Sequence, residues 1–166
     1  MILVREATPD DWEPLRDVRL AALSDAPYAF ASTYAREAAF TRETWRGRLS
    51  SERSVTFFAR EEPDDEVPAD LTPAGLAGVY VADGVADLVS RWVRPAARGR
   101  GAGEALLEAA AAWARARDFG ALFLWVTESN EPARRLYERC GFSPTGERQP
   151  LPSDPSLTEI RMSRAR

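Results

Sequence analysis

The chain contains no histidine, no lysine and only one cysteine among its 166 residues. Without histidine it cannot be a Ser-His-Asp or Cys-His hydrolase, and we expect no histidine-ligated metal site. Without lysine, Schiff-base catalysis and a Walker A phosphate loop are excluded. Cys140 has no partner for an internal disulfide, which suits a reducing compartment. Any side chain that accepts a proton near neutral pH must therefore be a carboxylate, acting directly or through water.

The charge balance and the hydrophobic pattern limit the classes of partner. The net charge is −4 and the isoelectric point is about 5.1, so no overall basic field would gather nucleic acid. No apolar run has the length of a membrane span, and acidic residues appear by Glu6, too early for a secretory signal. We expect a single cytoplasmic domain over residues 1–166, with no nucleic-acid or membrane partner.

The spacing of apolar residues predicts one mixed α/β domain in the order β-α-α-β-β-β-α-β-α-β-β. The predicted strands are 1–7, 54–60, 74–82, 85–93, 121–127, 142–147 and 157–162. The predicted helices are 11–23, 31–49, 101–117 and 131–140. Asp83-Gly84 between two strand-like runs indicates a hairpin, and the unbroken apolar run Ala121–Thr127 is typical of a central strand covered on both faces.

Two segments between these elements have the composition of loops. Glu61–Asp70 is acidic and is broken by Pro63 and Pro68, which predicts a solvated loop between strands rather than a binding segment. Gln149–Pro155 is rich in proline and predicts a loop between the last two strands.

The segment Val93–Glu104 has the composition of a phosphate-binding turn. A strand ends at Pro95, an arginine- and glycine-rich stretch follows, and a helix begins near Gly101. Helix N-termini offer unpaired N–H groups and the positive end of a dipole, and glycines allow a phosphate to approach the backbone. Arginine adds a charge and a shape that suit phosphate oxygens. The alternative is an ordinary strand–helix turn with solvated arginines, and the spacing fits neither the dinucleotide fingerprint nor a Walker A loop.

A second motif lies near the C-terminus, where residues 130–137 read N-E-P-A-R-R-L-Y and lead to C-G-F at residues 140–142. Together with R-x-x-G-x-G at residues 98–103, behind a strand ending W-V-x-P, it resembles the GNAT superfamily of acyl-CoA-dependent N-acyltransferases. The resemblance spans nearly the whole chain. It implies a single domain with a central mixed sheet of six to seven strands and helices on both faces.

The resemblance also implies a site for acetyl-CoA, used as a cosubstrate. The strand that ends at Trp92-Val93 would splay from strand 121–127, with the pantetheine arm in the gap and the pyrophosphate on the following turn. The cofactor-binding residues implied in this way are Trp92, Val93, Arg98, Gly99, Arg100, Gly101, Ala102, Gly103, Asn130, Arg134 and Tyr137. Asn130, Arg134 and Tyr137 share one helix face by their spacing, although a cap, a solvated arginine and a core tyrosine would show the same pattern.

For catalysis, the resemblance implies that Tyr137 protonates the departing thiolate, which a phenol near pKa ~10 can do over a short hydrogen bond. An attacking alkylamine must be neutral, so a carboxylate base is expected. The candidate bases are Asp87 and Glu128, with Glu37 as a third, and each is equally consistent with a surface charge. Cys140 has no neighbouring histidine to activate it, so direct transfer in a ternary complex is expected rather than a covalent acyl-enzyme.

The acceptor site is expected between the first two helices and the proline-rich loop. Its candidate residues are Tyr28, Phe30, Tyr34 and Glu37, for which core packing is an equal alternative. The acceptor would be an amine of a small molecule or peptide. The dimers that are common in this superfamily make a homodimer the expected partner, if any. Two other functions remain: a catalytically silent acyl-CoA-binding or sensor protein of the same fold, and an unrelated nucleotide-binding module.

Overall fold

A computed structural model describes residues 1–62 and 72–166, and these residues form one seven-stranded mixed sheet with helices on both faces. The strands lie in the order β1-β2-β3-β4-β5-β7-β6. Their bounds are β1 Ile2–Glu6, β2 Ser54–Glu61, β3 Gly75–Ala82, β4 Val85–Val93, β5 Ala121–Thr127, β6 Ser143–Leu151 and β7 Asp154–Ala165. The predicted fold class and the mixed sheet are confirmed.

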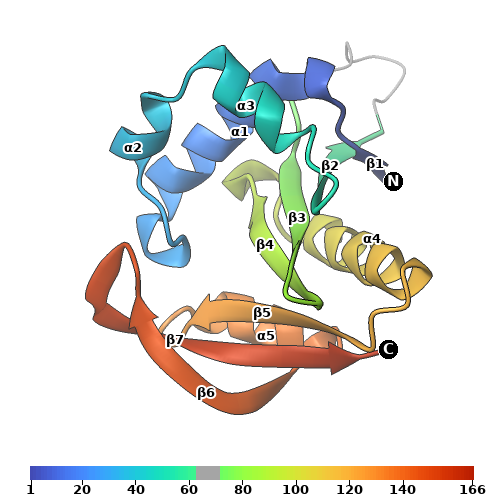
Figure 1. Cartoon of the computed structure of the whole chain (residues 1–166), viewed down its shortest axis with the longest axis vertical. Coiled ribbons are helices and arrows are strands. Elements are labelled where there is room, and N and C mark those ends of the chain that lie inside the picture. The colour runs from blue at the N-terminus through green and yellow to red at the C-terminus, as the bar shows by residue number, and fades with distance from the viewer. Residues whose placement is uncertain (63–71) are drawn as a thin grey trace.

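All neighbouring strands are antiparallel except β4 and β5, which are parallel. This pair joins two parts of the molecule, as Figure 1 shows: β1 to β4 with the first helices, and the smaller group of β5, β6 and β7. A parallel pair needs a long crossover connection, which the longest helix, α4 (Ala102–Ala116), provides.

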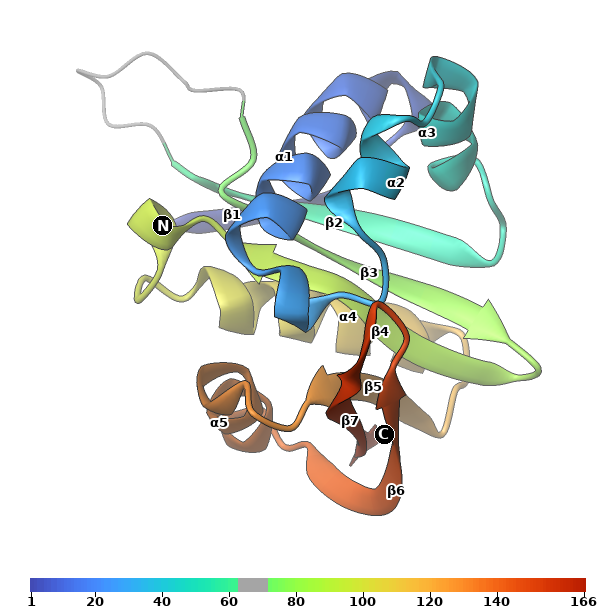
Figure 2. The same ribbon diagram turned by 90° about the vertical axis from the view of Figure 1, so that its left-hand side faces the viewer.

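The helices cover the sheet in two groups. The helices on one face are α1 (Trp12–Asp25), α2 (Tyr34–Ala38) and α3 (Arg42–Arg48), while α4 and α5 (Glu131–Arg139) lie on the other (Figure 2). Successive strand residues serve opposite faces: Phe57 packs into the α4 core and Phe58 into the α1 core. The apolar side chains of α4 belong to the α4 core, with Leu106 and Ala110 fully buried.

The single helix predicted over residues 31–49 is wrong. Two short helices, α2 and α3, occupy this region, preceded by a 3₁₀ turn at Pro27–Ala29. Thr33 and Thr41 each accept a hydrogen bond from the backbone N–H three residues later, so each starts a new helix. Two N-cap threonines in one apolar pattern separate the helices, although the apolar spacing continues across them.

The proline-rich loop predicted over 149–155 is also wrong in extent. Strands β6 and β7 are longer than predicted and continue through most of it as a hairpin, with Leu151 paired to Asp154. Pro150 is tolerated because β6 is an edge strand, where a missing N–H does not break a ladder. The acidic loop predicted over 61–70 lies mostly outside the described residues, apart from Glu61, which ends β2, and Glu62.

Within residues 1–62 and 72–166, no helix is long and apolar enough to cross a membrane.

Candidate active site

Strands β4 and β5 pair over only part of their length. Their registered pairs run from Ala86↔Leu122 to Leu88↔Leu124, yet β4 continues to Val93 and β5 to Thr127. Beyond Leu88 the two strands part, while β5 remains paired with β7 on its other side up to Thr127. The strand edges that face each other past this point carry backbone N–H and C=O groups that can pair with an extended ligand, apart from the Val93 carbonyl, which accepts a hydrogen bond from Arg98.

An irregularity in β4 accompanies this separation. Ser90 has a left-handed φ of 61°, and the pairing with β3 shifts register between Leu76 and Gly78, so β4 holds an extra residue there. Arg19 of α1 donates to Ser90 Oγ over 3.1 Å. The bulge is therefore anchored to the helix that covers this face.

The turn before α4 has the geometry of an anion site. Gly99 and Gly101 have φ values of 79° and 90°, and a Cβ on either would meet open space. No described residue accepts a hydrogen bond from the backbone N–H groups of Gly99, Arg100 or Gly101. Ala102 and Gly103 are buried, and Gly103 lies so close to Leu136 of α5 that a Cβ would come within 3.0 Å of it. The first part of the turn therefore offers backbone N–H groups as donors, while Ala102 and Gly103 pack closely against the rest of the protein.

Arg98 and Arg100 lie at this turn and form exposed ion pairs. Arg98 donates to Asp25 over 2.8 Å and to the Val93 carbonyl over 3.0 Å, and Arg100 contacts both oxygens of Glu61. The Trp92 indole also donates to Asp25, and this hydrogen bond, followed by that of Arg98, lowers the pKa of Asp25.

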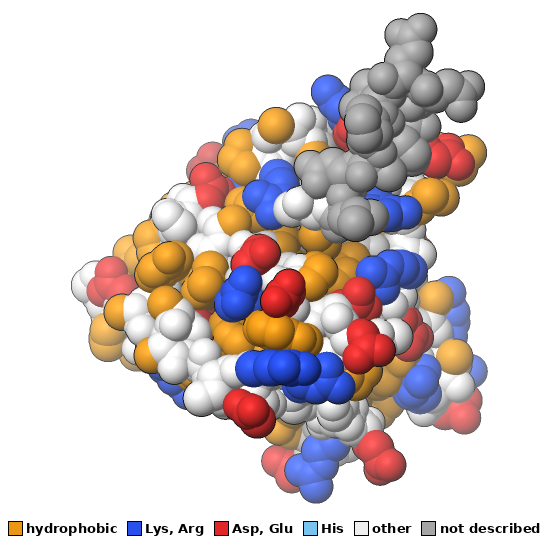
Figure 3. Space-filling model, turned by 90° about the horizontal axis from the view of Figure 1, so that it is seen from above, with side chains coloured by type: hydrophobic (Ala, Val, Ile, Leu, Met, Phe, Trp, Pro, Cys, Tyr) orange, Lys and Arg blue, Asp and Glu red, His pale blue; other side chains and the backbone are white. Residues whose placement is uncertain are grey.

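Trp92 and Val93 end β4 with their side chains buried in the two opposite cores. Only their backbone can therefore face a ligand between the strands. On the face seen in Figure 3, acidic and basic side chains are interspersed with apolar ones, and no wide field of one sign covers it.

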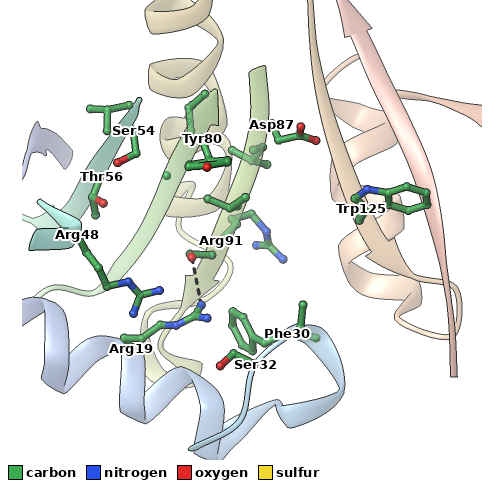
Figure 4. Close-up of a pocket in the computed structure, with 18 of the residues that line it drawn as sticks. Arg19, Phe30, Ser32, Arg48, Ser54, Thr56, Tyr80, Asp87, Arg91 and Trp125 are labelled. Carbon is green, nitrogen blue, oxygen red and sulfur yellow. Dashed lines mark hydrogen bonds between the residues drawn. The ribbon is translucent and has the colours of Figure 1, made fainter. Parts of the chain in front are cut away.

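A cavity of about 750 Å³ opens between the α1–α3 face of β3 and β4 and strands β5 and β7 (Figure 4). Its walls include Phe30 and Ser32 from the segment before α2, and Ser54, Thr56 and Tyr80 from β2 and β3. This volume is in the range of small-ligand sites.

Tyr137 of α5 lines the cavity. The side chain is otherwise buried, against Phe142 edge to face. Arg91, on the unpaired part of β4, donates from Nε to the Tyr137 hydroxyl oxygen over 3.0 Å, and its guanidinium lies 5.2 Å from the ring centroid. Because that oxygen already accepts from Arg91, the phenol proton is free to point into the cavity.

Glu37 is held in a buried ion-pair cluster. Its side chain is 1% exposed, accepts two hydrogen bonds from Arg19 at 3.0 Å, and accepts one from Arg48 at 2.8 Å. Burial alone would raise its pKa, but the two arginines outweigh burial and hold the pKa at about 2. Glu37 does not line the cavity wall directly.

The two predicted bases lie in different surroundings. Asp87 lines the cavity and is ion-paired with Arg161. Glu128 lies outside the cavity lining and contacts Arg148 at the surface. A further carboxylate, Glu159 of β7, lines the cavity and is buried; burial raises its pKa despite a hydrogen bond from Gln149.

The predicted acceptor tyrosines are not brought together with the cavity. Tyr28 and Tyr34 are about half exposed and neither lines it, whereas Phe30 does. The Arg19 guanidinium lies 4.7 Å from the Phe30 ring centroid, so this ring also supports the ion-pair cluster.

The second predicted motif forms the start of α5. Asn130 caps the helix by accepting from the Ala133 N–H, and Arg134 donates to the Glu128 carbonyl. Arg134 Nε is buried and has no hydrogen-bond partner among the described residues. No cluster of three or more metal-ligating side chains occurs in residues 1–62 and 72–166.

Glu159, Arg91 and Arg161 were not singled out from the sequence. Their positions depend on strand register: Glu159 lies opposite Thr127, and Arg161 lies opposite Trp125. The alternation of β7 could have indicated that Glu159 shares a face with Arg161, but not what covers that face.

A mixed sheet that parts at its one parallel pair, beside a glycine-rich helix N-terminus, defines the class as an α/β acyltransferase fold. The sequence agrees: it matches the model of the Acetyltransferase (GNAT) family over residues 15–142, and the chain belongs to this family.

Solved structures from this family cover the whole chain. An acetyltransferase of the GNAT family from Streptococcus pneumoniae superposes with a TM-score of 0.76 at 22% identity, covering 100% of both chains. A GCN5-related N-acetyltransferase from Kribbella flavida gives a TM-score of 0.74 at 28% identity, covering 99% of this chain and 98% of that one.

A curated relative matches a shorter part of the chain. It is a Bacillus subtilis (strain 168) protein whose name provisionally assigns it to alanine N-acetylation of ribosomal protein bS18. It is 33% identical over 76 residues, which are 46% of this chain and 50% of the relative. The match therefore spans half the length of that relative.

Proposed function

We propose that this protein is an N-acetyltransferase that moves an acetyl group from acetyl-CoA to an amine of a small molecule or peptide, by direct attack in a ternary complex. The observation that carries the proposal is the position of Tyr137, which lines the cavity. Its hydroxyl oxygen accepts a hydrogen bond from Arg91, which lies on the part of β4 that does not pair with β5. Family membership supports the reaction class.

The turn at residues 98–103 fits the pyrophosphate of acetyl-CoA. The open space above Gly99 and Gly101 and the unaccepted N–H groups support this role. Arg98 and Arg100 would exchange their exposed carboxylate partners for phosphate oxygens. The parted edges of β4 and β5 would pair with the pantetheine amides. Asn130 and Arg134, at the start of α5, would contact the cofactor. Acetyl-CoA would supply the acetyl group as an activated thioester.

Tyr137 is proposed as the general acid. As the amine nitrogen bonds to the carbonyl carbon, the carbon–sulfur bond breaks and the sulfur requires a proton. The Tyr137 hydroxyl donates it, and the Arg91 hydrogen bond to the phenol oxygen holds the ring in place and stabilises the phenolate that remains.

The proton lost by the amine goes to a carboxylate. Of the bases expected from the sequence, Asp87 is the one in the cavity, and its ion pair with Arg161 favours a binding role. Glu128 lies outside the cavity lining, which disfavours it. Glu159 is the base that the geometry supports best, because it is buried in the cavity with a raised pKa and therefore holds a proton more readily.

A covalent acyl-cysteine is not supported. Cys140 lies at the end of α5, does not line the cavity, and has its pKa raised by burial and then by the nearby Glu104 and Glu108 charges. A thiol with a raised pKa is a poor nucleophile at neutral pH.

The test is thiol release from acetyl-CoA across a panel of amines, with Tyr137→Phe alongside. We expect the variant to lose about a hundredfold in kcat while its affinity for acetyl-CoA stays unchanged, because the phenol acts only on the leaving group. Unchanged turnover would remove Tyr137 from the mechanism. Binding of acetyl-CoA without thiol release from any amine would instead support the silent acyl-CoA-binding alternative.

Glu159→Gln tests the base. If Glu159 accepts the amine proton, the wild-type rate rises with pH through its raised pKa, and this limb of the profile disappears in the variant. A variant that keeps the limb would point to Asp87 or to water alone.

A further inference from the structure

The cavity is richer in cations than an amine acceptor would require. Its lining includes five arginines, Arg19, Arg36, Arg48, Arg91 and Arg161. Only two carboxylates, Asp87 and Glu159, line it. The chain as a whole is acidic, with a net charge of −4, so this excess is local and opposite in sign to the protein.

The excess is concentrated on the wall made by α1, α2 and α3, which we term the arginine wall and define by Arg19, Arg36 and Arg48. Glu37 is the one carboxylate among the described residues that pairs with any of the three. The wall therefore carries two uncompensated positive charges. On the opposite side Arg161 is balanced by Asp87, and Arg91 faces a cavity that also holds Glu159.

The three arginines of the wall differ in what they can offer a ligand. Arg19 is 7% exposed, donates to Glu37 and Ser90, and stacks on Phe30, so its hydrogen bonds are committed. Within the described part of the chain, Arg48 donates one hydrogen bond, from Nη1 to Glu37, and no residue there accepts from its other N–H groups. No described residue accepts a hydrogen bond from the Arg36 guanidinium.

Arg36 and Arg48 are held over the same aromatic ring. Each guanidinium carbon lies 5.9 Å from the Phe40 ring centroid, and Arg48 also lies 5.2 Å from the Trp45 ring. Stacking limits the motion of these long side chains and leaves the edge of each guanidinium for hydrogen bonds. Figure 4 shows Arg48 and Arg19 directed from the helices into the cavity. Ser32 also lines the cavity, and its hydroxyl is buried.

We propose that the acceptor is a small amine that also carries a carboxylate or phosphate group, and that Arg36 and Arg48 bind this anionic group while the amine lies toward Tyr137 and Glu159. The inference rests on the proposed function for the amine end only. Guanidinium groups bind carboxylate and phosphate oxygens through paired, charge-assisted hydrogen bonds, and the cavity volume suits a small ligand rather than a folded partner.

The first test compares amines that carry an anionic group with neutral analogues that lack it. The pairs are β-alanine with β-alaninamide, and O-phosphoethanolamine with ethanolamine. We expect kcat/KM to favour the anionic member of at least one pair by about tenfold, and the pair that responds distinguishes a carboxylate from a phosphate ligand. Equal rates within both pairs, or faster turnover of a cationic peptide that begins with alanine, would overturn the proposal.

Variants assign the effect to the wall. In Arg36→Gln and Arg48→Gln the preference for the anionic member should fall toward one, mainly through KM. Arg42→Gln is the control: Arg42 lies on α3 and stacks on Trp12, 5.4 Å from its centroid, but does not line the cavity. Arg36 is exposed and unpaired, so its variant should fold even if loss of Arg48 from the Glu37 cluster is destabilising. A preference that survives Arg36→Gln and Arg48→Gln would also overturn the proposal.

A binding measurement separates this proposal from the proposed reaction. With CoA at saturation to occupy the glycine turn, glutarate should bind at millimolar concentration and neutral glutaramide should not. Glutarate binding that is lost in Arg36→Gln but kept in Arg42→Gln would support the anion site even if no amine releases thiol. Absence of glutarate binding together with equal rates within the amine pairs would overturn the anion site while leaving the acetyl transfer intact.

Discussion

Arginine occurs in two very different settings, at the glycine turn before α4 and on the arginine wall. At the glycine turn before α4, Arg98 and Arg100 are 51% and 60% exposed and pair with carboxylates at the surface. On the arginine wall, Arg19 is 7% exposed and shares the buried Glu37 with Arg48. The same type of side chain has an exposed partner at the turn and a buried, structural partner on the wall.

Burial explains the difference. An exposed ion pair contributes little, because water screens it, so Arg98 and Arg100 can leave Asp25 and Glu61 for a phosphate at small cost. A buried pair that loses one member leaves a charge without a partner in a medium of low polarity, and that is expensive. Arg98 and Arg100 can therefore change their anionic partners at small cost, whereas Arg19 cannot lose Glu37 without a large one.

The largest expected difference between the two regions lies in their carboxylates. Glu37→Gln should lower the free energy of unfolding by about 4 kcal/mol, because it leaves the Arg19 guanidinium buried without a counter-charge. Glu61→Gln, which removes the partner of Arg100, should cost less than about 1 kcal/mol. Urea denaturation measures both, and similar losses in the two variants would contradict the comparison.

The pH dependence of stability should reflect the same cluster. The native pKa of Glu37 is about 2, below the ~4.3 of an unfolded glutamate, so its contribution is complete above about pH 5 and is lost as the pH falls toward 2. The loss should be on the order of 3 kcal/mol. The gap between the urea midpoints of wild type and Glu37→Gln should therefore be clearly narrower at pH 2.5 than at pH 6. Asp11, whose pKa the Arg5 hydrogen bond also lowers to about 2, is common to both proteins and cancels. A gap as wide at pH 2.5 as at pH 6 would contradict the assignment.

A smaller effect is expected on cofactor affinity at the turn. Arg98→Gln should weaken CoA binding about tenfold, which is about 1.4 kcal/mol, and should reduce its salt dependence. The melting temperature should hardly change, because the Arg98–Asp25 pair is exposed. Calorimetry at two salt concentrations measures this, with Arg46→Gln as the matched control, since Arg46, on α3, forms an exposed pair with Asp10. Equal affinities in the two variants would remove Arg98 from the cofactor site.

The smallest effects are expected from two glycines, one in each region. Gly101→Ala should destabilise the fold by about 1 kcal/mol, because its φ of 90° is strained for any residue with a Cβ. Gly47→Ala, in helix α3, should stabilise it by up to about 1 kcal/mol, since a Cβ there meets open space and alanine favours the helix. Thermal unfolding measures both signs, and destabilisation by Gly47→Ala would contradict this account.

Local signals predicted the centre of the sheet well. Strands β4 and β5 begin and end where the sequence placed them, because an Asp-Gly turn precedes one and an unbroken apolar run forms the other. Prediction failed at residues 31–49 and at the β6–β7 hairpin. At residues 31–49 the apolar spacing continued across two capping threonines, which divide the region into two helices. At the hairpin the apolar pattern was weak, and strand pairing fixed the boundaries instead.

The candidate site likewise has one part that the sequence predicted and another part that it did not. The turn at residues 98–103 is continuous in the chain, so its glycines and the helix that follows were visible as a motif. Arg91 and Tyr137 are 46 residues apart, and Arg19 and Glu37 are 18 apart. Such contacts depend on how helices and strands pack, and no local sequence pattern predicts them.

The residue types present in the chain restricted proton transfer to carboxylates and a tyrosine. The order of the motifs along the chain indicated the family. Both conclusions depend only on which residues are present and in what order. The choice among the carboxylates was made by folding. Glu37 and Glu159 are the same residue type and both are buried, yet one has its pKa lowered by two arginines and the other has it raised by burial. A pKa depends on desolvation and on charges a few ångströms away in space, and those neighbours are set by packing.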